Sequence, residues 1–241
     1  MKHIFLALGT FFTLFFSSIS FAQTTGTTVP GAQPDFPGTL MVDMGLNFLL
    51  DAPSEMDTKI FASRGFNLYY MYEYYLGESR FAFLPGIGFG FVKFEFEDNV
   101  TLNDISGNDT LMLIELDDEV YEDVKKSQLA INYLDIPLEL RFTSNKDVRG
   151  KGVMVAVGGK FGLKLDSYTR IKYEQDSENK KSKLKQDYNL NAFRYGVHAR
   201  LGWRAINLYG YYALSTLFDK GEGPQQTEAT NVKIGLSIAL F

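Results

Sequence analysis

Eight long stretches of this sequence place an apolar side chain at every second position. Most of them run to ten residues or more, whereas a strand of a soluble protein usually has about five or six. A strand sends alternate side chains to opposite faces, and a tilted strand needs about 9–11 residues to cross the hydrocarbon layer of a membrane. The pattern therefore predicts membrane-crossing β-strands. The stretches are residues 39–50, 64–76, 80–96, 127–143, 152–171, 189–203, 204–218 and 231–241.

The connections between these stretches alternate in length. Short connections follow the second, fourth and sixth stretches, and the long ones are residues 51–63, 97–126, 172–188 and 219–230. Outer-membrane barrels show this asymmetry, with short periplasmic turns and longer external loops. The sequence therefore predicts an all-β fold, an eight-stranded antiparallel up-and-down transmembrane β-barrel with OmpA/OmpX-like architecture. An even strand number places both ends of the barrel domain on the short-turn side.

The amino-terminal segment has the features of a cleaved export signal. Lys2 precedes an apolar run at 4–19, and Ser20 and Ala22 supply the small side chains typical of a cleavage site. An uncleaved membrane anchor is disfavoured because the run is shorter than the ~20 residues that span a bilayer. We predict a signal peptide at 1–22, a flexible lead-in at 23–38 and the barrel at 39–241.

The two faces of the predicted strands differ sharply. One face is almost entirely apolar, and the other carries charges of both signs interspersed with glycines. The interior of an eight-stranded barrel is just wide enough for side chains to fill, and an unpaired buried charge is very costly. We therefore predict a salt-bridged plug in place of an open pore. The predicted interior charge network comprises Asp43, Glu73, Asp135, Glu139, Arg141, Lys160, Lys164, Arg194, His198 and Arg200.

A soluble barrel with the reverse orientation is the main alternative for the fold. A lipocalin-like barrel also has eight strands, but it buries its apolar face and shows its charges to water. The strand lengths and the loop asymmetry disfavour that arrangement. So do the 14 Tyr and 21 Phe, because a small interior could not hold so many bulky aromatic side chains.

One central strand carries a family resemblance. Residues 133–140 read YLDIPLEL, and the glycine-bearing segment 155–166, VAVGGKFGLKLD, follows them. In these segments and in its terminal strand the chain resembles the PorT-like outer-membrane β-barrel family of Bacteroidota. The resemblance implies an eight-stranded barrel that the barrel-assembly machinery inserts, and it implies a link to secretion or gliding for a few members. Within the same strand, Pro137 predicts an inward-pointing bulge or break, because proline removes a ladder hydrogen bond.

The sequence offers few candidate catalytic residues. His198 is the only histidine after the predicted signal, and it shares its face with Arg194 and Arg200. We interpret it as an ion-paired interior residue and predict no catalytic residues, no cofactor and no metal site. With no cysteine, thiolate ligands and disulfides are excluded. A net charge of −5 argues against a nucleic-acid partner.

The long connection 97–126 is the strongest candidate for an interaction. It holds ten acidic residues, and such oxygen-rich loops can bind Ca²⁺, which could bridge them to anionic lipopolysaccharide. A solvated external loop is the simpler alternative. Residues 110–124 are expected to form a short hairpin or helix, and 173–188 a flexible loop. The candidate cation contacts are Asp117, Asp118, Glu119, Glu122 and Asp123.

Together these features predict a non-enzymatic structural or surface-interaction protein that contacts outer-membrane lipid and lipopolysaccharide. Three alternatives remain at this point. They are a secretion-linked accessory protein with an unknown protein partner, a lipid-modifying barrel enzyme and a conducting pore.

Overall fold

The structure is a computed structural model that describes residues 38–103, 111–116, 123–144, 152–175, 177–203 and 205–240. The predicted signal peptide and all but the last residue of the predicted lead-in lie outside the described residues. The first described residue, Gly38, is also the first residue of strand β1.

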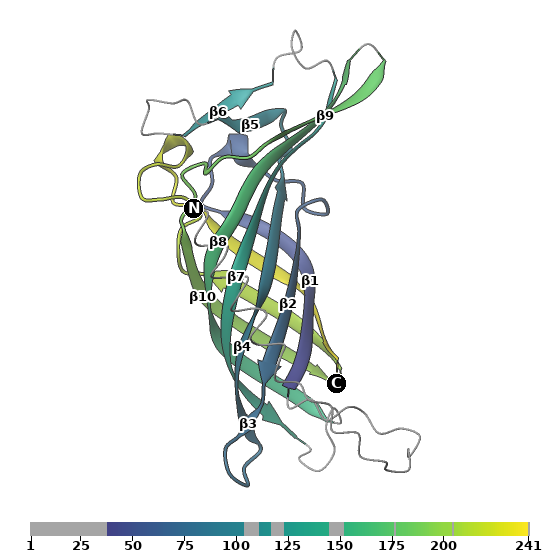
Figure 1. Cartoon of the computed structure of the whole chain (residues 1–241), viewed down its shortest axis with the longest axis vertical. Helices are drawn as coiled ribbons and strands as arrows, with labels where there is room; N and C mark the ends of the chain where they lie inside the picture. Colours follow the sequence, from purple (N-terminus) through teal and green to yellow (C-terminus); the bar gives the residue numbers. More distant parts are fainter. Residues whose placement is uncertain are drawn as a thin grey trace, which may run out of the picture. The chain divides into compact units, whose positions relative to one another are not determined.

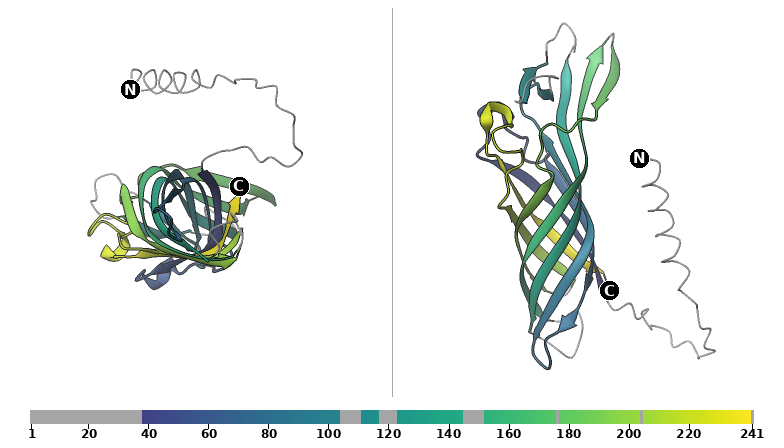
Figure 2. Two further views of the ribbon diagram at one scale, coloured as in Figure 1. Left: turned by 90° about the horizontal axis from the view of Figure 1, so that it is seen from below. Right: turned by 60° about the vertical axis from the view of Figure 1, so that its left-hand side comes forward.

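Eight antiparallel strands close into a ring, which confirms the predicted fold class. Each strand pairs with its neighbour along the chain, and the last strand pairs with the first, with Leu40 opposite Leu240. Figure 1 shows the tilted strands from the side, and the left view of Figure 2 shows them surrounding the interior. The strands are β1 (Gly38–Leu50), β2 (Arg64–Tyr72), β4 (Phe81–Glu95), β7 (Val124–Thr143), β8 (Val153–Gln175), β10 (Phe193–Trp203), β11 (Ile206–Ala213) and β12 (Thr230–Leu240).

The end of the ring with the long connections carries additional strands (Figure 1). There, β5 (Val100–Asn103) pairs with β6 (Met112–Glu115), and β9 (Glu178–Leu184) pairs with the extended end of β8. The hairpin expected within 110–124 therefore exists, but its first strand lies earlier in the chain. The flexible loop expected at 173–188 is wrong, because β8 and β9 form a regular hairpin. Both faces of this hairpin carry polar side chains, so its sequence lacks the alternation of apolar and polar residues that predicts a strand.

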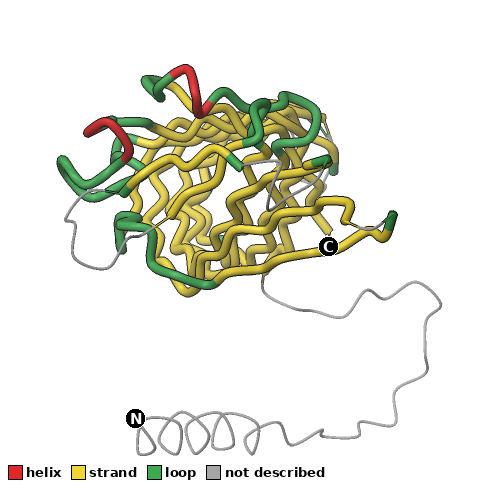
Figure 3. The backbone as a smooth tube through the Cα atoms, turned by 90° about the horizontal axis from the view of Figure 1, so that it is seen from above, coloured by secondary structure: helices red, strands yellow, loops and turns green. Residues whose placement is uncertain are grey.

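The opposite end of the ring has short turns, and β3 (Tyr74–Tyr75) pairs with β4 beside the first of them. Helical structure is limited to two 3₁₀ turns, η1 (Ser54–Met56) and η2 (Pro224–Gln226), among the described residues. Figure 3 shows both turns in red among the loops at the rim of the ring. None of the helices in the described ranges is long and apolar enough to cross a membrane.

The apolar face of the strands points outward. Val157 is 55% exposed, and Phe89, Leu208 and Ile234 are similarly exposed along the outer surface. Trp203 and Tyr74 lie at the short-turn end, where aromatic residues of membrane barrels meet the headgroups. An apolar belt exposed in this way is stable only if something other than water covers it.

A β-bulge interrupts the pairing of β7 with β8. Tyr133 pairs with Lys164 and Asn132 with Asp166, so Leu165 has no partner on β7. One extra residue reverses which face each later side chain occupies. Even-numbered residues of β8 therefore point inward before Leu165 and outward after it.

At Pro137 the structure has the predicted break in one ladder but no bulge. Pro137 pairs with Lys160 in unbroken register on the β8 side. On the β4 side, the ladder lacks the two pairs between Pro85–Leu138 and Gly88–Asp135, although the register on either side agrees. The missing N–H of Pro137 thus interrupts one ladder without inserting a residue.

Candidate functional site

A carboxylate–guanidinium pair lies at the centre of the ring interior. Arg194 of β10 donates three hydrogen bonds to Asp135 of β7, at 2.6, 2.9 and 3.1 Å. The hydroxyl of Tyr69 donates a fourth, at 2.7 Å. Lys160 Nζ lies 3.9 Å from Asp135 Oδ2, and the Arg194 guanidinium lies 3.6 Å above the ring of Tyr133. Asp135 is completely buried, so these partners replace its hydration.

Two glycines make room for this pair. A Cβ atom added to Gly90 would lie 2.4 Å from both Asp135 Oδ2 and Arg194 Nη2. At Gly162 it would lie 2.4 Å from Asp135 Oδ1. Gly90 and Gly162 flank Asp135 and Arg194 in neighbouring strands, so the pair occupies the space that their side chains would fill.

A second group of ion pairs is centred on Arg200 of β10. Its guanidinium donates to Asp43 at 3.0 and 3.2 Å and also to Glu139. Glu139 additionally accepts hydrogen bonds from Arg141 at 3.1 and 3.3 Å, and Arg141 continues to Glu73. One chain of charges thus crosses the interior from β1 through β10 to β7 and to Glu73, the residue that follows β2.

His198 belongs to this second group. Its Nε2 atom lies 3.3 Å from Glu139 Oε2, and its side chain is almost completely buried. This position is inside the ring, away from the outer surface where a lipid would lie. Across the described ranges, no three His, Cys, Asp or Glu side chains are grouped so that they could hold a metal ion.

Compared with the predicted interior charge network, Lys164 lies apart from the other members, and Lys233 and Asn67 join them. Lys164 points to the long-loop end, where its amine contacts Asp187 and the carbonyl of Leu190. Lys233 is fully buried and donates to Asn67 at 2.9 Å, and Asn67 in turn donates to Asp43 at 3.2 Å. The inward parity of Lys233 and Asn67 was a signal that could have placed them here.

Of the five predicted cation contacts in the acidic loop, the structure describes one. Asp117, Asp118, Glu119 and Glu122 lie outside the described residues. Asp123 is described and exposed. These contacts stay a prediction.

Buried apolar side chains lie in the interior on both sides of the charges. Towards the short turns, Met41, Met71 and Leu84 are buried together with Tyr69. Towards the long loops, a larger group forms what we term the apolar cap, which sequence reasoning missed. In β4 the apolar positions shift from odd to even numbers after Phe91, and this shift was a visible signal. The cap comprises Met56, Val92, Phe94, Phe96, Val100, Leu102, Leu111, Leu129, Ile131, Tyr133, Tyr188, Leu190, Leu217, Phe218 and Ala229.

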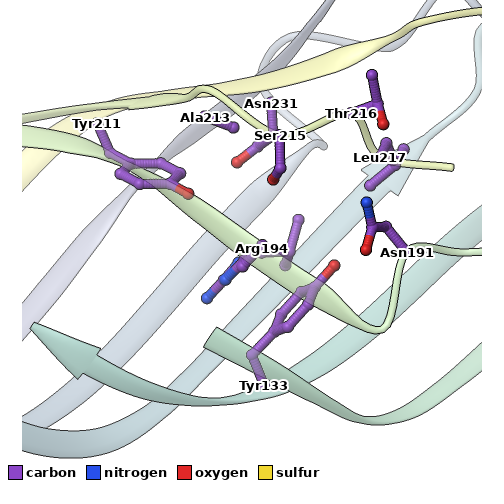
Figure 4. A pocket seen from close by; sticks show the side chains of 10 residues that line it. Tyr133, Asn191, Arg194, Tyr211, Ala213, Ser215, Thr216, Leu217 and Asn231 are labelled. Carbon is purple, nitrogen blue, oxygen red and sulfur yellow. The ribbon is translucent and has the colours of Figure 1, made fainter. Parts of the chain in front are cut away.

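A small cavity of about 20 Å³ lies where the cap meets the charges. Figure 4 shows Arg194, Tyr133, Tyr211 and Asn231 around it. This volume suits about one water molecule, which needs ~10–15 Å³. The interior therefore has room for ordered water at this level.

The chain belongs to the outer membrane protein beta-barrel domain family, whose model matches residues 32–219. The family and the eight-stranded ring together define an outer-membrane β-barrel protein. The exposed apolar belt is thus the surface that faces lipid.

Among curated proteins, no significant match was found. Among solved structures, the chain is similar to Ail, the attachment invasion locus protein of Yersinia pestis, in complex with the heparin analogue sucrose octasulfate. Identity is 12%, the match covers 84% of this chain and 97% of that chain, and the TM-score is 0.39. A mutant porin of Rh. blastica is 9% identical over 84% of this chain and 99% of that chain, with a TM-score of 0.21.

Proposed function

We propose that this protein is a closed, non-enzymatic barrel that acts at the cell surface through its long loops. The observation that carries the proposal is the set of buried side chains inside the ring. Ion pairs occupy the middle of the ring, and apolar side chains lie on both sides of them. A conducting pore needs a continuous path of water, and the apolar cap would interrupt such a path.

The charges inside the ring support a stabilising role. Four carboxylates (Asp43, Glu73, Asp135 and Glu139) and five basic side chains (Arg141, Lys160, Arg194, Arg200 and Lys233) face one another there. Near-balanced charges held by aromatic rings and hydrogen bonds form a compact plug. A permeation pathway would instead leave charged side chains in contact with a continuous column of water.

The position of His198 supports a protein without lipid-modifying activity. A catalytic group for that chemistry would have to reach the lipid boundary, whereas the His198 imidazole lies against Glu139 inside the ring.

The long-loop end favours surface interaction over a periplasmic accessory role. The β5–β6 and β8–β9 hairpins both lie there, whereas β3 is the one additional strand that the described residues place at the short-turn end. We infer that the protein is exported by its signal peptide and inserted by the barrel-assembly machinery. We also infer that it contacts lipopolysaccharide and an unidentified protein partner, and that it falls in the PorT-like group of Bacteroidota.

Cysteine labelling in intact cells tests this topology, because the native sequence has no cysteine. Lys220 is exposed in a long loop, and Glu78 is exposed in a short turn. We expect a membrane-impermeant maleimide to label the Lys220→Cys variant in intact cells. The Glu78→Cys variant should react only after the outer membrane is permeabilised. The reverse pattern would place the long loops in the periplasm and contradict the proposal.

A further inference from the structure

The outer face of the β7–β8–β9 sheet changes from apolar to basic at the Leu165 bulge. Below it, odd-numbered residues such as Val157 and Leu163 extend the apolar belt. Above it, the reversed parity brings Tyr168, Arg170 and Lys172 to the outer face. The belt therefore ends and a basic surface begins within a few residues of one strand.

Cations on this face are arranged in register across three strands. Lys126 of β7 pairs with Lys172 of β8, which pairs with Lys181 of β9. In the next row outward-facing Arg170 lies opposite Lys183. Like charges directly opposite one another in a sheet are destabilising, and among the described residues Lys126 is the one lysine of this row that has a carboxylate partner, Glu95. An anion bound to them would remove the repulsion.

Nearby carboxylates are already engaged. Glu95 lies 3.0 Å from Lys126 and 3.7 Å from Lys93, and Asp166 lies 2.9 Å from Lys185. Glu174 accepts a hydrogen bond from Lys125, and this bond raises the pKa of Lys125 above its ordinary value. Within the described part of the chain, no carboxylate forms an ion pair with Arg170, Lys172 or Lys181.

A groove of about 590 Å³ joins the basic surface to the apolar belt. Met44, Phe66 and Phe91 line its apolar part, and the rings of Phe66 and Phe91 lie 6.1 Å apart. Its basic part is lined by Arg64, Lys93, Lys126, Arg170 and Lys172. A ligand that fits this groove has an apolar part within the lipid layer and an anionic part directly above it.

We propose that this groove binds the phosphorylated headgroup of an outer-leaflet glycolipid. Its acyl chains would lie along Phe66 and Phe91, and its phosphate would contact Arg170 and Lys172. Arginine and lysine are the side chains best suited to phosphate oxygens, and arginine can bind them through two parallel hydrogen bonds. Placing the groove in the outer leaflet rests on the proposed topology, with the long loops external.

Lipid retention by the full mature protein tests the proposal. The protein is folded into phosphatidylcholine vesicles containing a small fraction of diphosphorylated lipid A, or the same lipid with its phosphates removed. It is then extracted in EDTA, and the retained lipid A per barrel is measured by mass spectrometry. EDTA removes divalent cations, so any bridge between the acidic loop and the lipid is lost. Both leaflets of such vesicles contain the lipid, so the result does not depend on topology.

We expect the phosphorylated lipid to be retained roughly tenfold better than the dephosphorylated one, as a few charge-assisted contacts would allow. The Arg170→Gln/Lys172→Gln double variant should lose most of this preference. The matched Lys180→Gln/Lys220→Gln variant removes the same charge elsewhere. Lys180 pairs in register with Tyr173 on the opposite face of the hairpin, so this variant should keep the preference.

Three results would overturn the proposal. One is no preference for the phosphorylated lipid, as expected if the acidic run at 117–123 occupies the cations. Another is equal retention by both double variants. The third is retention that appears in a parallel extraction without EDTA but not in the extraction with EDTA. Heat-modifiable migration of the same samples reports whether each barrel is folded, so failure to bind lipid is distinguished from failure of the barrel itself.

Discussion

Replacing Asp135 by alanine is expected to lower the free energy of unfolding by about 3–5 kcal/mol, because it leaves buried charge without its partner. Arg194 would lose three hydrogen bonds, and Lys160 would lose its nearest carboxylate. Both cations are buried inside the ring, where little bulk water is available to replace the carboxylate. Urea-induced unfolding, followed by the loss of heat-modifiable migration, measures the change.

Asp166→Ala is the matched control for this prediction. Asp166 also pairs with a cation from a neighbouring segment, at 2.9 Å, but its side chain is 35% exposed and that of Lys185 is 60% exposed. Exposed pairs contribute about 0–1 kcal/mol. If Asp135→Ala costs no more than Asp166→Ala, the charges of the interior do not stabilise the barrel.

The Arg200→Glu substitution is expected to have the largest effect of any single change, more than about 4 kcal/mol. It removes the cation between Asp43 and Glu139 and places a third carboxylate beside them. In the folded barrel these three groups would repel one another at short range with little water to screen them. The fraction of protein that reaches the heat-modifiable folded form during refolding is the first readout.

Two further variants keep this prediction testable if the first variant fails to fold. Arg200→Met removes the cation that Asp43 and Glu139 share without adding a third carboxylate, so its stability should fall between that of the native protein and that of Arg200→Glu. Arg80→Glu makes the same charge change at an exposed position in a short turn and should shift stability by about 0.5 kcal/mol or less. Equal effects at Arg80 and Arg200 would show that net charge, and not the buried contacts, controls folding.

Strand periodicity was sufficient to predict the ring and the orientation of most side chains. Leu134 to Phe142 and the corresponding stretches each present one apolar face, and only an outward orientation accommodates so many aromatic residues. The Leu165 bulge could not be predicted, because it depends on how β8 pairs with β7 and not on β8 alone. The β8–β9 hairpin was missed because Lys180 and Lys181 make both of its faces polar.

The ion-pair partners of inward-facing side chains were harder to predict than the fact that these side chains face inward. Lys164 and Lys233 both have inward parity, yet only Lys233 joins the chain of charges. Their heights along the barrel depend on the stagger between strands, which a single strand does not reveal. The apolar cap, in contrast, was predictable from the parity change at Val92, Phe94 and Phe96.

Ion conductance across a planar bilayer tests the closed interior most directly. The folded mature protein is added at high salt, with a conducting porin as positive control. We expect no steady current steps, because the ion pairs around Asp135 and Arg200 and the buried side chains of the apolar cap lie inside the ring. Steady unit conductance that increases with the number of inserted barrels would contradict a closed interior.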